Sequence, residues 1–488
     1  MDVKTGEERF NILYEAHVKA KEKGLAVDYS GIDTIRLSIP IQARSIPLGE
    51  KTDFKGTVFV VDNDSKENFF LFSLCGKADT LKISNNLLID IGNFKTISCL
   101  KTGLKMLVIE DQNPWIDNRR GFSYGMKRRD ILLLNNGKAL NHSCAPYNNE
   151  YSNPICTSVS VSKEVKSFSN AVLHRTATSK RKTFFVKFEN QYNVHISNIG
   201  IVTPDGTGQF GDTGIFLKDC ANVSMKNVNI DGSYSLNDKW GYGISLNNVY
   251  NIDFDQIEGN APWGVFGNNN VNKARLKNSH VNRFDVHCYG RDFFFENCLF
   301  DKSGFLYSSI YGDVRFEQCT FKNVFPCLNR IDFNAYTPFN IVFANCDFYF
   351  DNSHYALVNL SDIDDIENPR QELSDKCIPN VQIENCSINL CSGIEYVFAF
   401  YVGGCKYSKP IKGLSFFSMK NITVSGTEAP MKMFNTYVRT EKAVDLNIDH
   451  VSYQECERRI PNYRFFSETM LNHSEPKKKA VRGHQYIK

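Results

Sequence analysis

A short phrase that recurs along the chain constrains its fold more than any other feature. An Asn or Gln is followed by a small or apolar residue, one polar residue and one apolar residue, as in "KNVNI" (226–230), "ENCLF" (296–300) and "EQCTF" (317–321). These Asn or Gln residues stand at 198, 227, 256, 278, 297, 318, 345, 385 and 421, with spacings of 29, 29, 22, 19, 21, 27, 40 and 36 residues. Spacings near 20 fit one turn of a parallel β-helix, and longer spacings fit a turn that carries a loop insertion.

The residues before each repeat read as short strands. "NIDFDQ" (251–256), "DVRFEQ" (313–318) and "NVQIEN" (380–385) alternate polar and apolar residues and are rich in Phe, Val and Ile. This period of two is typical of strands, whereas a helical solenoid needs apolar residues three and four apart. We therefore predict an all-β fold, a right-handed parallel β-helix solenoid whose Asn and Gln positions stack about 4.8 Å apart.

Cysteines occupy a fixed place in several repeats. Of fifteen cysteines, none forms a CxxC pair, so neither a disulfide framework nor a zinc site is indicated. Cys298, Cys319, Cys346 and Cys386 follow the repeat Asn or Gln directly. We expect these four to form an internal ladder of buried, reduced thiols that act as small hydrophobic residues.

The two ends of the chain differ from the middle. Residues 6–24 place Phe10, Leu13, Tyr14 and Val18 on one helical stripe and end at Gly24, so we predict a helix that covers the open strand edges at the amino-terminal end. The predicted organisation is a capping helix within 1–30, a β-helix over 31–452 with regular coils from about 190, and a charged tail over 453–488.

Composition excludes several classes of protein. An apolar content of 42% with 23% charged residues argues against disorder, and a formal net charge of +3 gives no sign of a nucleic-acid partner. No apolar run approaches the length of a membrane span. The start "MDVKTGEERF" has no apolar signal region. We nevertheless expect an extracellular, periplasmic or cell-surface protein whose export signal is missing from this chain.

The coil pattern, the helical start and the stretch "IPLGEKTDFKGTVFVV" (46–61) resemble the right-handed parallel β-helix superfamily typified by pectate lyases. The resemblance is strongest over 190–452. It implies a carbohydrate-active protein, because the superfamily includes polysaccharide lyases, glycoside hydrolases, sugar epimerases and phage tailspikes that bind or cut surface glycans. The chain has no "NTD", "GHG" or "RIK" of the polygalacturonases and no obvious pectate-lyase calcium signature. Fold alone does not assign the activity.

The stretch "RFDVHCYG" (283–290) is the candidate functional site. Phe284, Val286 and Cys288 should face the core, which turns the alternate residues outward. Alignment with "PWGVFGNNN", "FLYSSIYG" and "CLNRIDFN" in neighbouring coils extends this outer patch with aromatic and polar side chains, which suit sugar rings and hydroxyls. The patch comprises Trp263, Asn268, Arg283, Asp285, His287, Tyr289, Tyr307, Tyr311, Arg330 and Asp332.

Lyase chemistry on an acidic, uronic-acid-containing glycan is the favoured hypothesis. A base removes the proton next to the carboxylate, an acid protonates the leaving oxygen, and a cation holds the carboxylate. We assign the base to His287, the acid or base to Tyr289, Tyr307 or Tyr311, and the cation to Arg330. Trp263, Asn268, Arg283 and Asp332 are expected to bind substrate. The sequence shows no cluster of metal ligands, so we expect neither a metal nor another cofactor.

Two alternatives remain open. A glycoside hydrolase would use Asp285 and Asp332, two rungs or about 9.6 Å apart, close to the separation of about 6.5–9.5 Å found in inverting enzymes. A glycan-binding tailspike or adhesin would use the same outer patch without cleavage. The expected partner in each case is a polysaccharide, and the protein is either a monomer or a homotrimer.

Overall fold

The structure is a computed structural model that describes residues 5–62, 69–82, 88, 103–116, 126–141, 151–176, 183–203, 214–232, 242–260, 264–307, 310–329, 339–351, 356–360, 379–391, 394, 397–402, 416–426, 431–434 and 445–454. The chain forms two compact units. The first comprises Met1–Asn113 and Arg128–Val281, and the second comprises Pro114–Lys127 and Asn282–Lys488.

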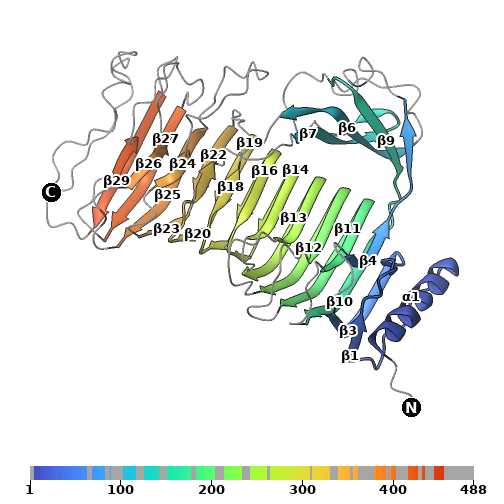
Figure 1. Ribbon diagram of the computed structural model, residues 1–488. Helices are drawn as coiled ribbons and strands as arrows, with labels where there is room; N and C mark the ends of the chain where they lie inside the picture. The colour runs from blue at the N-terminus through green and yellow to red at the C-terminus, as the bar shows by residue number, and fades with distance from the viewer. Residues whose placement is uncertain are drawn as a thin grey trace. The chain divides into compact units, whose positions relative to one another are not determined.

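Parallel strands stacked coil on coil form the body of the first unit (Figure 1). Phe188 pairs with Leu217, and Leu217 pairs with Leu246, so inward apolar side chains repeat from coil to coil. This arrangement confirms the predicted parallel β-helix. Its strands are β1 (Thr34–Ser38), β2 (Ile46–Pro47), β3 (Lys51–Asp62), β4 (Phe69–Cys75), β10 (Lys166–Arg175), β11 (Thr183–Thr203), β12 (Ile215–Gly232), β13 (Tyr242–Asn260), β14 (Gly264–Lys277) and β15 (His280–Val281).

An antiparallel sheet that the sequence did not predict interrupts these coils. The chain leaves the coils after β4 and returns at β10, which pairs with β3. The sheet has the order β5-β9-β6-β7-β8. Its side chains alternate, so that Met106, Val108 and Ile131 pack toward Ala221 on the coils while their neighbours form a separate core. The strands are β5 (Ala78–Leu81), β6 (Leu104–Ile116), β7 (Met126–Asn135), β8 (Lys138–Ala139) and β9 (Pro154–Ser160).

Helix α1 (Gly6–Glu22) covers the first strands, as predicted. Thr5 and Glu8 form a capping box at its start, and Gly24 follows its end with φ of +65°, a conformation that glycine adopts without strain. The buried face contains Phe10, Leu13 and His17. The Phe10 ring lies 5.9 Å from that of Phe69 in β4, so the helix closes the end of the apolar core (Figure 1).

The repeat asparagines stand at backbone corners in the left-handed conformation. In β11, φ is 53° at Asn190, 61° at Asn193 and 55° at Asn198. Asn and Asp tolerate this region because their short polar side chains hydrogen-bond locally. The side chains also form ladders: Asn198 Nδ2 donates to Asn170 Oδ1 and Asn227 Nδ2 donates to Asn198 Oδ1, each at 2.8 Å. The repeated Asn therefore serves both the corner and the stacking.

The second unit repeats the same architecture. The Phe295, Phe316 and Phe343 rings stack with centroids 4.7 and 5.1 Å apart. Asn297, Gln318 and Asn345 occupy equivalent left-handed corners, which confirms their predicted stacking. The strands are β16 (Phe284–Glu296), β17 (Leu299–Phe300), β18 (Phe305–Tyr307), β19 (Ile310–Glu317), β20 (Thr320–Lys322), β21 (Cys327–Asn329), β22 (Phe339–Ala344), β23 (Asp347–Phe350), β24 (Ala356–Leu360), β25 (Asn380–Leu390), β26 (Val397–Val402), β27 (Phe416–Ser425), β28 (Met431–Phe434) and β29 (Asp445–Gln454).

The cysteine ladder is buried and carries free thiols, as predicted for Cys298, Cys319, Cys346 and Cys386. Each Sγ lies 3.1–3.4 Å from the carbonyl oxygen two residues earlier, across the left-handed corner. A small side chain with a weak donor therefore suits this position. The predicted domain boundaries at 30 and 452 stay predictions, and all but the first two residues of the predicted tail lie outside the described residues.

Candidate functional site

Three polar residues share one face at the start of β16. Phe284 and Val286 are fully buried in the apolar core. Because side chains alternate along a strand, Asp285 and His287 lie on the opposite face of β16. Arg283, just before the strand, reaches the same carboxylate.

A single carboxylate oxygen joins these residues. Arg283 Nη2 lies 2.5 Å from Asp285 Oδ2, and His287 Nε2 lies 3.4 Å from the same oxygen. The Asp285 side chain is 0% exposed, Arg283 is 8% exposed and His287 is 14% exposed. His287 has the largest exposed fraction of the three and is therefore the member of the cluster that is most open to a ligand. Arg283 and Asp285 form a buried ion pair, and removing one partner of such a pair leaves an uncompensated charge, which costs about 3–5 kcal/mol.

A carboxylate against one ring nitrogen fixes the orientation of a histidine. This arrangement suits a proton acceptor or donor, and it makes Asp285 a positioning residue. The expectation that Asp285 lies open in a groove is wrong, because the guanidinium of Arg283 and neighbouring groups enclose it. Within the described part of the chain, no three His, Cys, Asp or Glu side chains converge as metal ligands do.

Tyr307 faces the core, so its predicted outward orientation is wrong. It is 1% exposed, and its ring stacks on that of Phe305, 5.7 Å away. The register pairs Phe305 with Phe284 and Tyr307 with Val286, both of which are core residues. The turn that precedes β18 thus shifts the inward and outward alternation of side chains along this strand by one residue from the predicted register.

Tyr311 and Asn268 are also buried, in different settings. Tyr311 pairs in register with Arg291, and the adjacent Ile310 is fully buried. Asn268 is 0% exposed and pairs with the core residue Leu246, so its predicted place in an outer groove is wrong. Trp263, Arg330, Asp332 and the side chain of Tyr289 lie outside the described residues.

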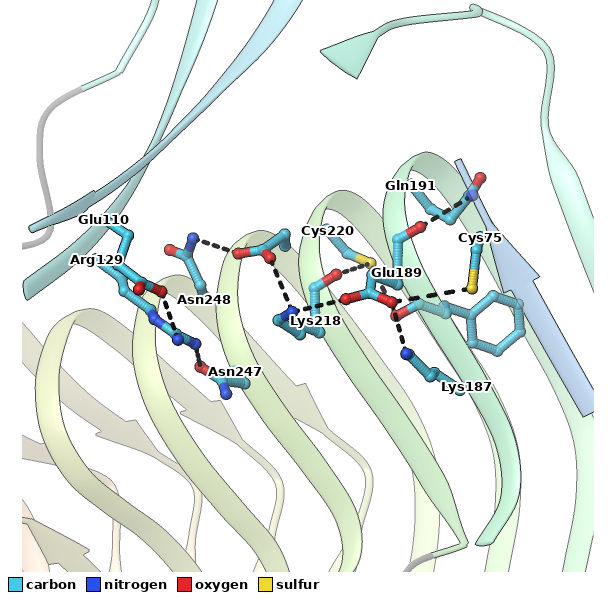
Figure 2. A network of polar contacts seen from close by, with 12 residues as sticks. Cys75, Glu110, Arg129, Lys187, Glu189, Gln191, Lys218, Cys220, Asn247 and Asn248 are labelled. Atoms are coloured by element: carbon cyan, nitrogen blue, oxygen red, sulfur yellow. Dashed lines mark hydrogen bonds and ion pairs between the residues drawn. The ribbon is translucent and has the colours of Figure 1, made fainter. Parts of the chain in front are cut away.

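Sequence reasoning missed a second polar network, which lies on the first unit. The Glu189 carboxylate forms ion pairs with Lys187 and with Lys218 of the next coil (Figure 2). Arg129 of β7 contacts Glu110 of β6 and Asn247 of β13. The 29-residue spacing of "VKFENQ" (186–191) and "IFLKDC" (215–220) was the available signal, because it places Lys218 over Glu189.

Comparison with known proteins defines the class of fold. No protein-family model matches the sequence, and no curated protein matches it. The chain is similar to the tailspike protein gp49 from Pseudomonas phage LKA1, with a TM-score of 0.57 and 14% identity over 89% of this chain and 73% of that one. It is also similar to the Pseudomonas phage phi297 tailspike gp61, with a TM-score of 0.50 and 12% identity over 89% of this chain and 73% of that one.

These similarities and the parallel strand register both indicate a parallel β-helix. The chain is a parallel β-helix protein whose fold is shared with these two phage tailspikes. Helix α1, in the described part of the chain, is neither long enough nor apolar enough to cross a membrane.

Proposed function

We propose that the protein binds a polysaccharide and cleaves it by β-elimination, with His287 as the proton-accepting residue. The observation that carries this proposal is the Asp285 carboxylate, which lies 3.4 Å from His287 Nε2 and is itself held by Arg283. The parallel β-helix fold, shared with phage tailspikes, supports a glycan as the substrate. It also supports an extracellular or virion-surface location.

The proposed reaction needs a uronic acid, because the proton removed lies next to a carboxylate. His287 takes this proton, the electron pair forms a C=C bond, and the glycosidic oxygen leaves with a proton from an acid. Asp285 holds the imidazole ring in place, while Arg283 balances the charge of Asp285. Arg330 as the carboxylate-binding cation and Tyr289 as the acid remain predictions from the sequence.

The burial of Asp285 favours elimination over hydrolysis. A hydrolase needs two carboxyl groups that touch the glycosidic bond or a water beside it. Asp285 has an exposed fraction of zero and already engages Arg283 and His287, so it fits a positioning role better than contact with a sugar.

Glycan binding without cleavage is the second candidate, and the same burial is the observation that favours it. A buried Arg–Asp pair often has a purely structural role, and only 14% of the His287 side chain is exposed. Under this alternative the coils present a passive recognition surface, as a monomer or a homotrimer.

The test is a screen of acidic and neutral polysaccharides with two readouts, ultraviolet absorbance from a new C=C bond and release of reducing ends. Elimination gives both signals, hydrolysis gives reducing ends alone, and binding without cleavage gives neither. His287→Ala should lower kcat by about 10²-fold or more, the usual weight of a general acid or base. His280→Ala is the matched control, because the His280 side chain is 42% exposed and lies 3.6 Å from the exposed carboxylate of Glu258.

Asp285→Asn separates positioning from direct chemistry. The amide keeps the shape of the side chain but loses its charge, so we expect a partial loss of kcat with a changed pH profile. The melting temperature of each variant shows whether the fold survives. Full activity of His287→Ala on a cleaved substrate would contradict the proposal.

A further inference from the structure

Three phenylalanine rings lie on the outer face of the first unit, where a solvated strand normally carries polar side chains. Phe70 and Phe184 stack with centroids 4.5 Å apart, and Phe216 lies 5.6 Å from Phe70. All three rings are partly exposed. They come from β4, β11 and β12, so they form an aromatic strip across successive coils. Partly exposed aromatic rings of this kind offer stacking surfaces to the apolar faces of sugars.

A cationic cluster adjoins the aromatic strip. Lys187 Nζ lies 5.6 Å from the centroid of the Phe70 ring and 2.6 Å from Glu189 Oε2. Lys218, which stands over Glu189 in the next coil, places its Nζ 2.6 Å from Glu189 Oε1. Two ammonium groups thus share one carboxylate (Figure 2).

The lysines are the outermost members of this cluster. The Lys187 and Lys218 side chains are 25% and 32% exposed, whereas Glu189 is 19% exposed and Asp219 is 12% exposed. Asp219 lies 3.8 Å from Lys218 Nζ and accepts a hydrogen bond from Asn248 Nδ2 at 2.7 Å. The face presented to solvent is therefore more positive than the balance of charges suggests.

The antiparallel sheet borders the same face. Arg129 Nη1 donates to Asn247 Oδ1 at 3.1 Å, and Arg129 Nη2 lies 2.5 Å from Glu110 Oε2. Asn247 pairs in register with Lys218, so this contact continues the row of polar groups (Figure 2). Amide and guanidinium groups in such a row are suitable partners for sugar hydroxyls.

We propose that the aromatic strip and the cationic cluster form a saccharide-binding site for an acidic sugar, separate from the His287 cluster. The rings of Phe70 and Phe216 stack on the sugar, and Lys187 and Lys218 bind its anionic group. The choice of a saccharide as ligand rests on the proposed function, and the site itself requires no bond cleavage. It holds an acidic glycan chain while the reaction, if any, proceeds elsewhere.

The direction in which Glu189→Gln changes the affinity for an acidic sugar distinguishes this site from a set of structural ion pairs. Glu189 competes with a ligand anion for both lysines. Glu189→Gln should therefore tighten binding of an acidic sugar, by about 3-fold or more, since one competing charge-assisted contact to each lysine is lost. Lys187→Ala and Lys218→Ala should each weaken it by a similar factor or more. A purely structural cluster gives no such opposite signs.

The experiment is calorimetry with trigalacturonate as the acidic probe and maltotriose as the neutral one. Every variant is made in the full chain that already carries His287→Ala, so that cleavage does not interfere. Lys226→Ala is the matched control, because Lys226 is a 56% exposed lysine of β12 with an ion pair of its own to Asp255. We expect trigalacturonate to bind at least several-fold more tightly than maltotriose, and added salt to weaken it.

Three results would overturn the proposal: no binding of trigalacturonate at about 10 mM, well above the Kd of even a weak specific site; equal affinity in Lys187→Ala, Lys218→Ala and Lys226→Ala; or weaker binding in Glu189→Gln. Failure here leaves cleavage by the parent protein untouched. Conversely, a parent protein without cleavage activity still tests this site, because the readout is binding.

Discussion

His17 Nε2 and Tyr29 Oη lie 2.5 Å apart beneath helix α1, in the core that closes the amino-terminal end of the coils. The His17 ring also packs against Phe72, 5.9 Å away. Burial lowers the pKa of His17 to about 4, although a hydrogen bond with the backbone of Pro47 partly opposes this shift. The histidine is therefore neutral in the folded protein at neutral pH.

Acid should consequently destabilise the docking of α1. Above pH of about 6.5, His17 is neutral in both the folded and the unfolded chain. As the pH falls from there toward 4, the unfolded chain binds a proton that the folded chain does not, so the free energy of unfolding decreases. The difference between the two pKa values corresponds to about 3 kcal/mol. The measurement is the melting temperature across this range.

His17→Gln isolates this contribution. Glutamine stays neutral and retains hydrogen-bonding groups, while every other titrating group is unchanged. The variant should lose less stability than the parent between neutral pH and pH of about 4. Equal losses in the two proteins would show that His17 does not control the acid response.

Asn198→Ala should lower the free energy of unfolding by about 2 kcal/mol. The substitution places alanine at a left-handed corner, which costs about 1–2 kcal/mol, and removes hydrogen bonds to Asn170 and Asn227. Lys226→Ala, at an exposed position with ordinary backbone conformation, should change it by no more than about 0.5 kcal/mol. Calorimetric melting of both variants gives the comparison, and similar melting temperatures would count against the corner argument.

Asn268→Leu should stabilise the first unit. The Asn268 side chain is fully buried beside Leu246, and neither of its polar atoms has a hydrogen-bond partner among the described residues. A buried unsatisfied polar group costs about 1–3 kcal/mol, and leucine has a similar volume. Asn268→Ala removes the amide without filling its space, so it should be less stable than the leucine variant. A lower melting temperature for Asn268→Leu than for the parent would contradict this prediction.

Thiol labelling should divide the cysteines by depth. Cys75 and Cys391 are exposed and should react in the folded protein, whereas Cys298, Cys319, Cys346 and Cys386 should react only after denaturation. Burial raises the pKa of the Cys319 thiol well above its usual range, which further suppresses the reactive thiolate. Peptide mapping by mass spectrometry assigns each labelled position. Rapid labelling of the four ladder cysteines would mean that the coils open readily.

The recurring sequence motif made the coils predictable because Asn meets two local requirements, the left-handed backbone corner and a side-chain hydrogen bond. Asn tolerates the left-handed corner and donates to the Asn of the adjacent coil, so its recurrence marks corners without any knowledge of distant contacts. The inert role of the cysteine that follows has the same local origin. The strand before each corner was equally readable from its period of two.

The face of residues after the corner was much harder to predict. The loops between corners vary in length, and a shift of one residue reverses every side chain. Tyr307 and Asn268 were assigned to the outer surface and lie in the core. Only the register with Val286 and Leu246 decides this.

The sequence by itself determined a stacked, parallel all-β chain with Asn corners, an internal thiol ladder and an amino-terminal capping helix, because these features depend on neighbours in the chain or on a fixed repeat. The tertiary structure decided which polar residues meet. Lys218 reaches Glu189 because adjacent coils pair in register, and Arg129 reaches Asn247, 118 residues away, because an inserted antiparallel sheet packs on the coils. The Arg129–Asn247 contact joins segments whose separation no local pattern encodes, and its energy arises only when both partners are held in place.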